Sequence, residues 1–375
     1  MARKDLHEEP FDDSTIAKLE IFQDYAKAWI PTFVMQPRVS TICIFDFFAG
    51  TGYDKNEVPG SPIRILEEIK KQIGNIFKQK VKIKVYLNEF EPEKKDQKKF
   101  ELLNQACSEY LENNQDVKRA IEIIYFNEDF ENLFSKLIPS IKQFPSLVYL
   151  DQNGIKYLSD KYLLELEKLK QTDFLYFVSS SYFLRFGNKP EFKEHVDIDM
   201  SLARKDPYKC IHRNIIEQLR KKLPSNTDLK LYPFSLKKGS NIYGIIFGAS
   251  HLRAVDKFLS IAWRRNGING EADFDIDEDF AKKQDDMFDK KLTKIDQFKE
   301  NVRSMVLDKA ITNNFELFSF ALEHGHIGSH AADCLKGMKK NGEVSFEGIS
   351  PLVTYDNVYK NKKKIEYQIL KNETQ

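Results

Sequence analysis

The chain lacks several features that would assign it at once to a simple class. Only 4 of its 375 residues are cysteine, and they lie too far apart to form a CxxC motif or a cysteine–histidine zinc motif. We therefore expect reduced cysteines, a cytoplasmic protein and no metal site. No apolar run is long enough for a transmembrane helix, and the N-terminal segment lacks the apolar core of a signal peptide. We therefore expect neither secretion nor insertion into a membrane.

The chain also lacks an excess of charge of either sign. Its 58 Lys and Arg residues nearly balance its 57 Asp and Glu residues, so the formal net charge is +1. This balance excludes a uniformly basic protein that coats nucleic acid and an acidic, solvating chain, but it leaves room for a local basic face. Apolar residues are plentiful, with 29 Phe and 16 Tyr. We therefore expect a sizeable folded core rather than a disordered chain.

The first half of the chain alternates between two patterns of apolar residues. Short, nearly continuous apolar runs are typical of strands that are buried on both faces of a parallel sheet. Between them lie segments with apolar residues at helical spacing. This alternation predicts repeated βαβ units and a doubly wound α/β sheet of the Rossmann type. The predicted strands span residues 41–47, 81–87, 121–126, 147–150 and 173–178, and the predicted helices span 14–30, 63–77, 95–113, 130–141 and 157–169.

The second half of the chain follows a different pattern. Apolar runs at 229–236 and 242–248 flank a short loop with Gly239, which predicts an antiparallel hairpin. A helix is predicted over 252–264. A helix, a turn, a second helix and a short strand over 315–346 are typical of a winged helix. The predicted domains are a Rossmann-like, methyltransferase-type domain with an N-terminal helix over 1–265, a charged linker that runs into a helix over 266–312, and a winged-helix-like α+β domain with a basic tail over 313–375.

A glycine-rich loop, Asp46-Phe-Phe-Ala-Gly-Thr-Gly52, directly follows the first predicted strand. Gly50 and Gly52 let the backbone turn sharply and approach a ligand closely. The loop would lie at the carboxyl edge of the sheet, where open α/β folds bind ligands. Because the full GxGxxG fingerprint is absent, a nicotinamide cofactor is disfavoured. A tight turn that binds nothing is the simpler alternative.

Acidic residues follow the next three predicted strands as well. Glu89, Asp129 and Asp151 stand directly after them, and the carboxyl ends of parallel strands meet at one edge of the sheet. Any one of these acids is explained by helix capping. Their repetition beside the glycine-rich loop indicates a nucleoside-type ligand, since a carboxylate at the position of Glu89 can accept hydrogen bonds from ribose hydroxyls.

In their order along the chain these motifs resemble those of the three-Cys-motif partner (TcmP) family. The resemblance covers residues 14–345 and rests on Phe48-Ala-Gly-Thr-Gly52, Gly60-Ser-Pro62, Asp151-x-x-Gly154 and an opening helix with Lys18-Leu-Glu-Ile-Phe. That family resembles class I S-adenosylmethionine-dependent methyltransferases. It is named for a partner, a separate protein with a three-cysteine motif that resembles radical-SAM proteins. Such pairs are associated with bacterial mobile elements and phage defence.

The resemblance implies S-adenosylmethionine as cofactor. Nucleic acid, DNA or RNA, is indicated by the predicted winged helix and the local basic residues, together with the nucleoside-type site. Amino-methylating enzymes carry (Asp/Asn)-Pro-Pro-aromatic after the fourth strand, where the aromatic residue stacks on the base. Here the motif is Asp151-Gln-Asn-Gly154, without the aromatic residue. The alternative is therefore a catalytically degenerate module that binds nucleic acid or a partner protein. The implied site residues are Asp46, Ala49, Gly50 and Gly52 at the methionine end of the cofactor, Glu89 on the ribose, Asp129 near the adenine, and Asp151 and Asn153 as catalytic residues.

Basic residues also gather locally. Three lysines of the second helix in the predicted winged helix are spaced to share one face, where they would contact phosphates. Three histidines just before and within that helix, at 324, 326 and 330, resemble a metal-ligand set. They lack a fourth ligand and a cysteine at zinc spacing, so we predict no zinc site. The predicted nucleic-acid contacts are Lys336, Lys339 and Lys340.

Overall fold

The computed structural model describes residues 10–92, 98–152, 157–186, 198–199, 201, 208–284 and 291–370. The chain divides into two compact units, Met1–Ser250 (unit 1) and His251–Gln375 (unit 2). Unit 2 begins just before a helix that the sequence analysis placed at the end of the first domain. Within the described residues, no helix combines the length and the apolar character needed to cross a bilayer.

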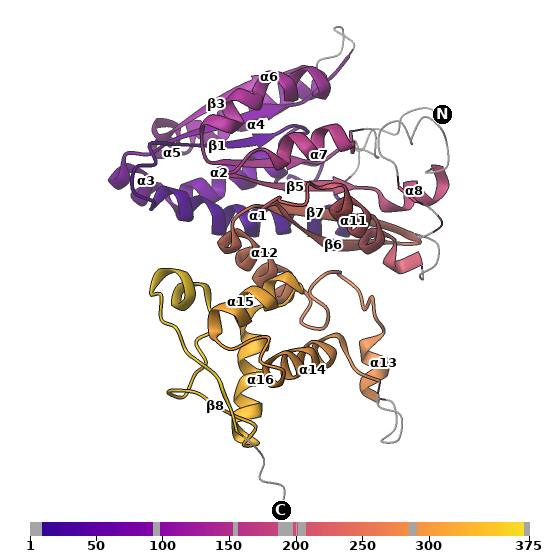
Figure 1. Ribbon diagram of the computed structural model, residues 1–375. Coiled ribbons are helices and arrows are strands. Elements are labelled where there is room, and N and C mark those ends of the chain that lie inside the picture. Colours follow the sequence, from indigo (N-terminus) through magenta and orange to yellow (C-terminus); the bar gives the residue numbers. More distant parts are fainter. Residues whose placement is uncertain are drawn as a thin grey trace, which may run out of the picture. The chain divides into compact units, whose positions relative to one another are not determined.

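Unit 1 is built on a seven-stranded sheet with the strand order β3-β2-β1-β4-β5-β7-β6 (Figure 1). The first five strands pair in parallel, whereas β7 is antiparallel to both β5 and β6. The structure thus confirms an α/β class, a mostly parallel sheet compatible with a Rossmann fold, and the hairpin. The strands are β1 (Thr41–Asp46), β2 (Lys82–Asn88), β3 (Ile121–Phe126), β4 (Ser146–Leu150), β5 (Thr172–Val178), β6 (Lys230–Lys238) and β7 (Asn241–Ala249).

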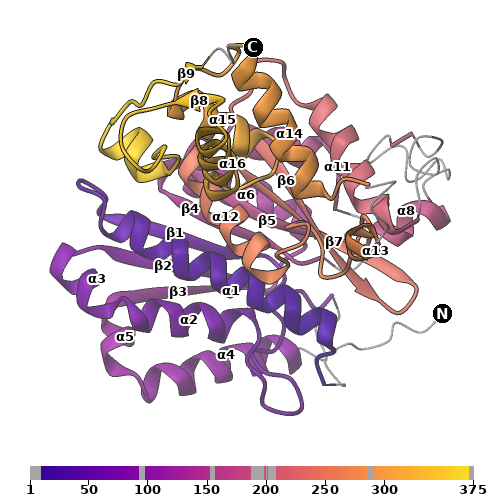
Figure 2. The ribbon, with the colours of Figure 1, turned by 90° about the horizontal axis from the view of Figure 1, so that it is seen from below.

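Helices cover both faces of this sheet (Figures 1 and 2). Helices α1 to α5 pack against one another on one face, α6 and α7 lie on the other, and α11 packs against the β6–β7 hairpin. Every residue of the central strand β4 is buried, which is why its sequence is a continuous apolar run. The helices are α1 (Asp13–Val34), α2 (Ser61–Lys71), α3 (Ile73–Gln79), α4 (Lys98–Glu112), α5 (Gln115–Ala120), α6 (Phe130–Gln143), α7 (Asp160–Glu167), α8 (Ser180–Phe186) and α11 (Ile211–Lys222).

Several predicted helix ends differ from the structure, and the predicted helix over 63–77 is divided into α2 and α3. Two of the differences have a clear local cause. Pro31 does not end the first helix, because it lies in the last turn, where its missing N–H removes only one hydrogen bond, and α1 continues to Val34. Helix α7 begins at Asp160 rather than at residue 157, because the Ser159 side chain accepts a hydrogen bond from the Tyr162 N–H and caps it there.

Unit 2 consists mainly of helices, with a small sheet near its C-terminal end. Three of its helices, α14, α15 and α16, pack together, and the two-stranded antiparallel sheet β8–β9 follows α16 in sequence. The winged-helix assignment of this segment stays a prediction. The elements are α12 (Leu252–Arg265), α13 (Asp279–Gln284), α14 (Lys294–Leu307), α15 (Asn314–Glu323), α16 (Gly328–Lys340), β8 (Val344–Ser345), the short helix η3 (Asp356–Lys360) and β9 (Gln368–Ile369).

Candidate functional site

The candidate site lies where the strand order of unit 1 reverses. Strands β1 and β4 are neighbours in the sheet, but the chain passes from β1 to β2 on one side and from β4 to β5 on the other. Open α/β sheets bind ligands outside the carboxyl ends of the strands at such a switch point. Asp46 at the end of β1 pairs in register with Tyr149 of β4, so Asp46 and Asp151 belong to neighbouring strand ends.

The glycine-rich loop takes a conformation that requires glycine. Gly50 and Gly52 have φ angles of 69° and 91°, in the left-handed region. The Gly50 N–H donates to Oε2 of Glu89 at 2.8 Å, so the end of β2 holds the loop that follows β1. At Gly52 a Cβ would lie 2.7 Å from the Cβ of Ala106 on α4, so close packing alone explains glycine there. Gly50 is therefore the better candidate for contact with a ligand.

Ala49, which was predicted to line the cofactor, is buried in the same loop. Its N–H donates to the backbone carbonyl of Asn88 at 2.9 Å. The buried Asn88 side chain donates to the carbonyls of Phe47 and Glu128, both at 3.1 Å, and so ties together the segments that follow β1 and β3. Sequence analysis missed Asn88, whose only signal was its position at the end of a predicted strand.

Asp46 is buried, with 1% of its surface exposed, and its carboxylate holds the glycine-rich loop in place. Its carboxylate accepts a hydrogen bond from the Phe48 N–H at 3.1 Å and one from the Ser61 hydroxyl at 2.5 Å. Burial raises the pKa of Asp46 to about 7; the nearby charges of Asp151 and Glu89 act in the same direction, and its two hydrogen bonds oppose the shift. The carboxyl group of Asp46 therefore changes charge close to neutral pH.

Asp151 lies at the end of β4 and forms an ion pair with Lys18 of α1. Both side chains are largely buried, with 17% and 10% of their surfaces exposed. The Lys18 ammonium also lies 4.4 Å from the centre of the Phe177 ring on β5, a favourable cation–π contact. Helix α1 is anchored nearby by Phe22, whose ring stacks on Tyr149 at 4.0 Å.

Sequence analysis did not assign Lys18 to the site, although the pattern contained a signal. Lys18 precedes Phe22, Tyr25 and Trp29 by four, seven and eleven residues, so it lies on the apolar stripe of the predicted helix. A lysine on a buried stripe requires a partner that compensates its charge. Asp151 is that partner in the structure.

The rest of the motif after β4 is described only in part. Asn153, predicted to be catalytic, lies outside the described residues. Gln152 is fully buried, and its Oε1 accepts a hydrogen bond from the Tyr157 N–H at 2.7 Å. Its Nε2 has no partner among the described residues. The second residue of the motif is therefore directed into the protein, where it contacts the backbone of Tyr157.

Asp129, at the end of β3, both caps a helix and adjoins an aromatic cluster. Its carboxylate accepts hydrogen bonds from the Glu131 N–H at 3.0 Å and from the Tyr157 hydroxyl at 3.1 Å. The Phe48 ring lies 5.7 Å from that of Tyr157, and both side chains are partly exposed. Sequence analysis assigned no role to these two rings, which offer a planar group a surface for stacking beside a carboxylate.

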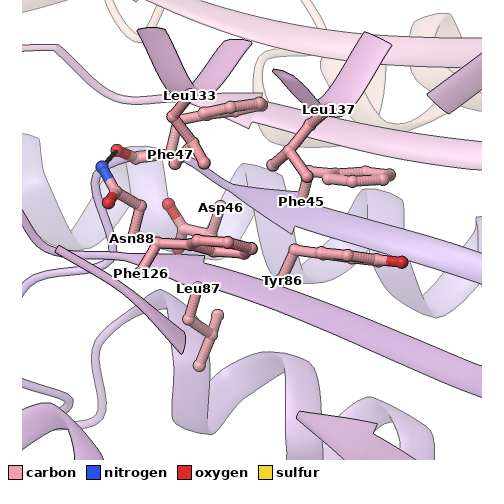
Figure 3. A pocket seen from close by; sticks show the side chains of 9 residues that line it. All are labelled: Phe45, Asp46, Phe47, Tyr86, Leu87, Asn88, Phe126, Leu133 and Leu137. Atoms are coloured by element: carbon pink, nitrogen blue, oxygen red, sulfur yellow. Dashed lines mark hydrogen bonds between the residues drawn. The ribbon is translucent and has the colours of Figure 1, made fainter. Parts of the chain in front are cut away.

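A small internal space lies beneath the loop, between β1, β2, β3 and α6 (Figure 3). It has no room for a molecule the size of water, and Asp46 and Asn88 are the polar residues among the apolar side chains that line it. Small-molecule sites usually measure roughly 300–1,000 Å³. A nucleoside would therefore have to lie over the loop and not in this space.

The three lysines predicted to bind nucleic acid have different surroundings in unit 2. Lys336 forms an ion pair with Asp333 at 3.3 Å, and Lys340 is exposed at the end of α16. The Lys339 ammonium instead donates to the backbone carbonyls of Phe346 and Gly348, both at 2.8 Å, and lies 4.2 Å from the centre of the Phe346 ring. Lys339 thus fixes the loop that follows β8.

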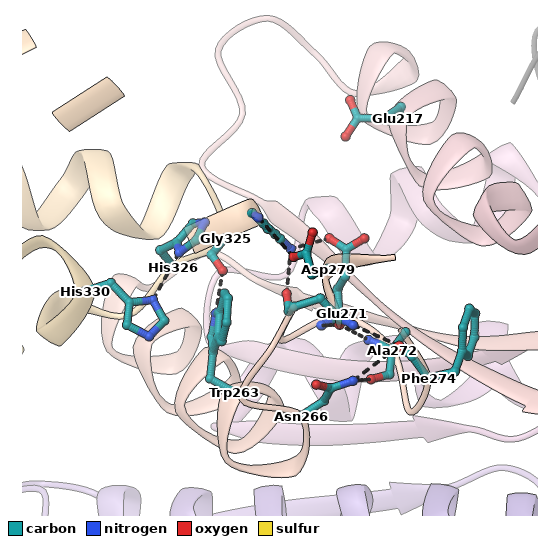
Figure 4. A network of polar contacts seen from close by, with 12 residues as sticks. Glu217, Trp263, Asn266, Glu271, Ala272, Phe274, Asp279, Gly325, His326 and His330 are labelled. Carbon is teal, nitrogen blue, oxygen red and sulfur yellow. Dashed lines mark hydrogen bonds and ion pairs between the residues drawn. The ribbon is translucent and has the colours of Figure 1, made fainter. Parts of the chain in front are cut away.

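Two of the three histidines form a buried contact in unit 2 (Figure 4). Nδ1 of His326 lies 3.0 Å from Nδ1 of His330, and the His326 ring stacks on Phe298 at 3.9 Å. Burial lowers the pKa of His326 to about 2 and that of His330 to about 4, so both are neutral at neutral pH. Among the described residues, no three His, Cys, Asp or Glu side chains come together as metal ligands.

Two comparisons with known proteins found no match. No protein-family model matches the chain, and no curated protein matches it. The TcmP resemblance therefore stays a prediction from the sequence motifs, and the function has to be argued from the geometry of the site.

Proposed function

We propose that the chain is a methyltransferase-like protein that binds S-adenosylmethionine at the carboxyl edge of β1, β2 and β4 and acts on nucleic acid. The observation that carries this proposal is the hydrogen bond from Gly50 to Glu89 at the switch point of the sheet, beside Asp151. In keeping with the TcmP resemblance, its context would be bacterial mobile-element or phage defence, with a three-Cys-motif protein as partner.

The electrostatics of the edge suit this cofactor. S-adenosylmethionine carries a sulfonium and an ammonium group, and Asp46, Glu89 and Asp151 bring three carboxyl groups to neighbouring strand ends. The left-handed turn at Gly50 lets a ligand pass close to the backbone. Asp129, beside the rings of Phe48 and Tyr157, offers the combination of acceptor and stacking surface that an adenine needs.

In the catalytic version of the proposal the chain's own residues position the reactants. When bound, S-adenosylmethionine supplies an electrophilic methyl group. Asp151 would accept a hydrogen bond from the amine that attacks this group, and Lys18 would hold the Asp151 carboxylate in place.

The contacts of the motif after β4 favour a second candidate. The Asp151 carboxylate is already paired with the Lys18 ammonium, and the Gln152 side chain is directed into the protein. Both contacts also suit a catalytically degenerate domain, in which the motif serves the fold. Such a chain would act as a nucleic-acid-binding or partner-binding subunit.

We further propose that the segment 313–375 comprises a winged-helix-like domain and a basic tail. Helices α15 and α16 would form the helix-turn-helix, and β8 with β9 would form the wing. The contacts of Lys339 support this proposal, because they join the end of α16 to the loop of the wing.

Calorimetric titration of the purified chain with S-adenosylmethionine tests the cofactor, and tritiated methyl transfer to DNA and RNA, with and without the three-Cys-motif partner, tests catalysis. Binding with methyl transfer would support the enzyme. Binding without transfer under either condition would favour the degenerate module. The absence of binding at millimolar cofactor would refute the cofactor assignment.

A further inference from the structure

An exposed cation precedes each of the five parallel strands of the sheet in unit 1. Because these strands run in the same direction, their starts meet at the amino edge, opposite the glycine-rich loop. Each cation lies two to four residues before its strand. Since neighbouring strands are ~4.8 Å apart, the cations spread over a row of roughly 19 Å. In the order of strands β3, β2, β1, β4 and β5, this amino-edge row consists of Arg119, Lys80, Arg38, Lys142 and Lys170.

The cations of the amino-edge row are not paired within the chain. None of the five forms an ion pair with another described residue. Other lysines close to them in sequence do form such pairs. Lys82 pairs with Glu122 at 2.5 Å, and Lys71 pairs with Glu68 at 2.6 Å. The row therefore presents unpaired positive charge to solvent, although the chain as a whole is nearly neutral.

The helix dipole explains only part of this row. Cations stabilise the C-terminal ends of helices, and Arg119 and Lys142 lie in the last turns of α5 and α6. The effect of the dipole is confined to the last turn. Arg38 lies four residues beyond the end of α1, and Lys170 lies three residues beyond the end of α7. These two cations need another explanation.

Two cations of the row occupy backbone positions that favour glycine. Arg38 and Lys80 have φ angles of 72° and 56°, in the left-handed region. Lys80 caps the C-terminal end of α3, and helices that end in this conformation usually do so with glycine. A side chain at such a position lowers stability relative to glycine. Cations at two such positions indicate that their charge serves a contact outside the chain.

Exposed apolar side chains lie close in sequence to these two cations. Phe77, in the last turn of α3, is 49% exposed, and Met35, three residues before Arg38, is 48% exposed. The Lys80 N–H donates to the Phe77 carbonyl at 3.2 Å, so the ring and the ammonium group project from the same helical turn. Helix α3 lies at one end of the sheet, beside α5, in both views (Figures 1 and 2). Proteins that bind single-stranded nucleic acid combine such rings, on which bases stack, with cations that contact phosphates.

We propose that the amino edge of the sheet binds single-stranded nucleic acid, with the phosphate backbone along the amino-edge row and a base stacked on Phe77. This inference rests on the nucleic-acid part of the proposed function and adds a surface in unit 1 that is separate from the candidate site. An anionic membrane fits less well, because membrane binding requires a broad apolar helix face. Helix α3 has seven residues, and its Ile76 is buried.

The test uses the full chain and a fluorescently labelled oligothymidylate, with affinity measured by fluorescence anisotropy over a range of salt concentrations. The double variant Arg38→Gly/Lys80→Gly should weaken binding and reduce the slope of log affinity against log salt by about 1.4, the value for two phosphate contacts on a single strand. The same variant should raise the melting temperature, because glycine relieves both left-handed positions, so a loss of folding cannot explain weaker binding. Phe77→Ala should weaken binding at least about fivefold without changing the salt slope.

Lys309 provides a matched control, because it is an exposed lysine with a φ angle of 60° that follows α14 in unit 2. Lys309→Gly should raise the melting temperature in the same way but leave affinity and salt slope unchanged. Wild-type affinity and slope in the Arg38→Gly/Lys80→Gly variant would overturn the proposed surface while leaving nucleic-acid binding intact.

Two further results would also overturn it. One is a wild-type chain that binds no single strand, in which case the S-adenosylmethionine titration and the methyl-transfer assay would still decide the proposed function. The other is binding to phosphatidylserine vesicles, but not to oligothymidylate, that is lost in the double variant. That result would assign the amino-edge row to a membrane surface.

Discussion

Replacing Asp46 by asparagine should remove a pH dependence from the stability of unit 1. The substitution keeps the size of the side chain and an oxygen that can accept from the Phe48 N–H, while the amide can donate to the Ser61 hydroxyl. Only the titrating proton is lost. The buried carboxyl has a pKa of about 7 instead of the ordinary 3.8. Between these values the folded protein holds a proton that the unfolded chain has released, so stability falls as pH rises.

The magnitude follows from the two pKa values. Between about pH 5 and about pH 8 the wild type should lose roughly 2.5 kcal/mol of unfolding free energy relative to Asp46→Asn, as an upper bound. Urea unfolding at several pH values measures this difference. Trp29 of unit 1 and Trp263 of unit 2 are the two tryptophans of the chain, so a Trp263→Phe background lets Trp29 fluorescence report on unit 1.

Asp173 serves as an internal reference, because its buried carboxyl also has a pKa raised to about 7 and is present in both proteins. Its contribution cancels in the comparison. Parallel curves of unfolding free energy against pH for the two proteins would mean that Asp46 is already ionised in the folded state at pH 5. Burial would then not raise the pKa of Asp46 as stated. If the difference appears, S-adenosylmethionine should bind more tightly as pH rises through 7, because ionised Asp46 adds negative charge beside a cationic ligand.

Three further predictions concern the site and its support. Gly50→Val should abolish binding of S-adenosylmethionine in calorimetry, since a branched side chain at a φ of 69° is strained and stands where the ligand would pass. Gly248→Ala should lower stability by about 1–3 kcal/mol in urea unfolding, because its Cβ would lie 2.0 Å from the Phe174 ring. Lys18→Met should cost about 3 kcal/mol by leaving a largely buried carboxylate without its partner, and adding Asp151→Asn should restore most of that loss. Equal stability of the single and double variants would show that the ion pair does not matter.

The strands of the sheet could be predicted from the sequence because burial on both faces leaves a local signal, which is a short run of apolar residues. Strands that are buried on both faces are mostly apolar, and this property predicted β1 and β4 as buried strands. The hairpin was marked by two apolar runs around Gly239. Helix ends were less predictable. Pro31 lies in the last turn of α1 without ending the helix, and the Ser159 cap makes α7 begin at Asp160.

The candidate site was predictable only in outline. The positions of Glu89 and Asp151 follow from strand ends, but their partners come from segments far away in sequence. Lys18 reaches Asp151 from a helix that precedes the first strand, and no local pattern pairs the two residues. The contacts of Lys339 could not be predicted for a related reason. Its partners are backbone carbonyls of a folded loop, which a count of basic residues on a helix face does not reveal.

The ion pair of Lys18 and Asp151 is where the two proposed functions differ in physical terms. In an enzyme the Asp151 carboxylate has to accept a hydrogen bond from the substrate while it remains paired, and 17% of its surface is still exposed. A carboxylate has about four acceptor sites, so one oxygen can hold the Lys18 ammonium while the other binds an amine. In a binding module the same pair only joins α1 to the end of β4. The ion pair is therefore compatible with catalysis. In an active enzyme, the exposed part of the Asp151 carboxylate would have to contact the substrate amine.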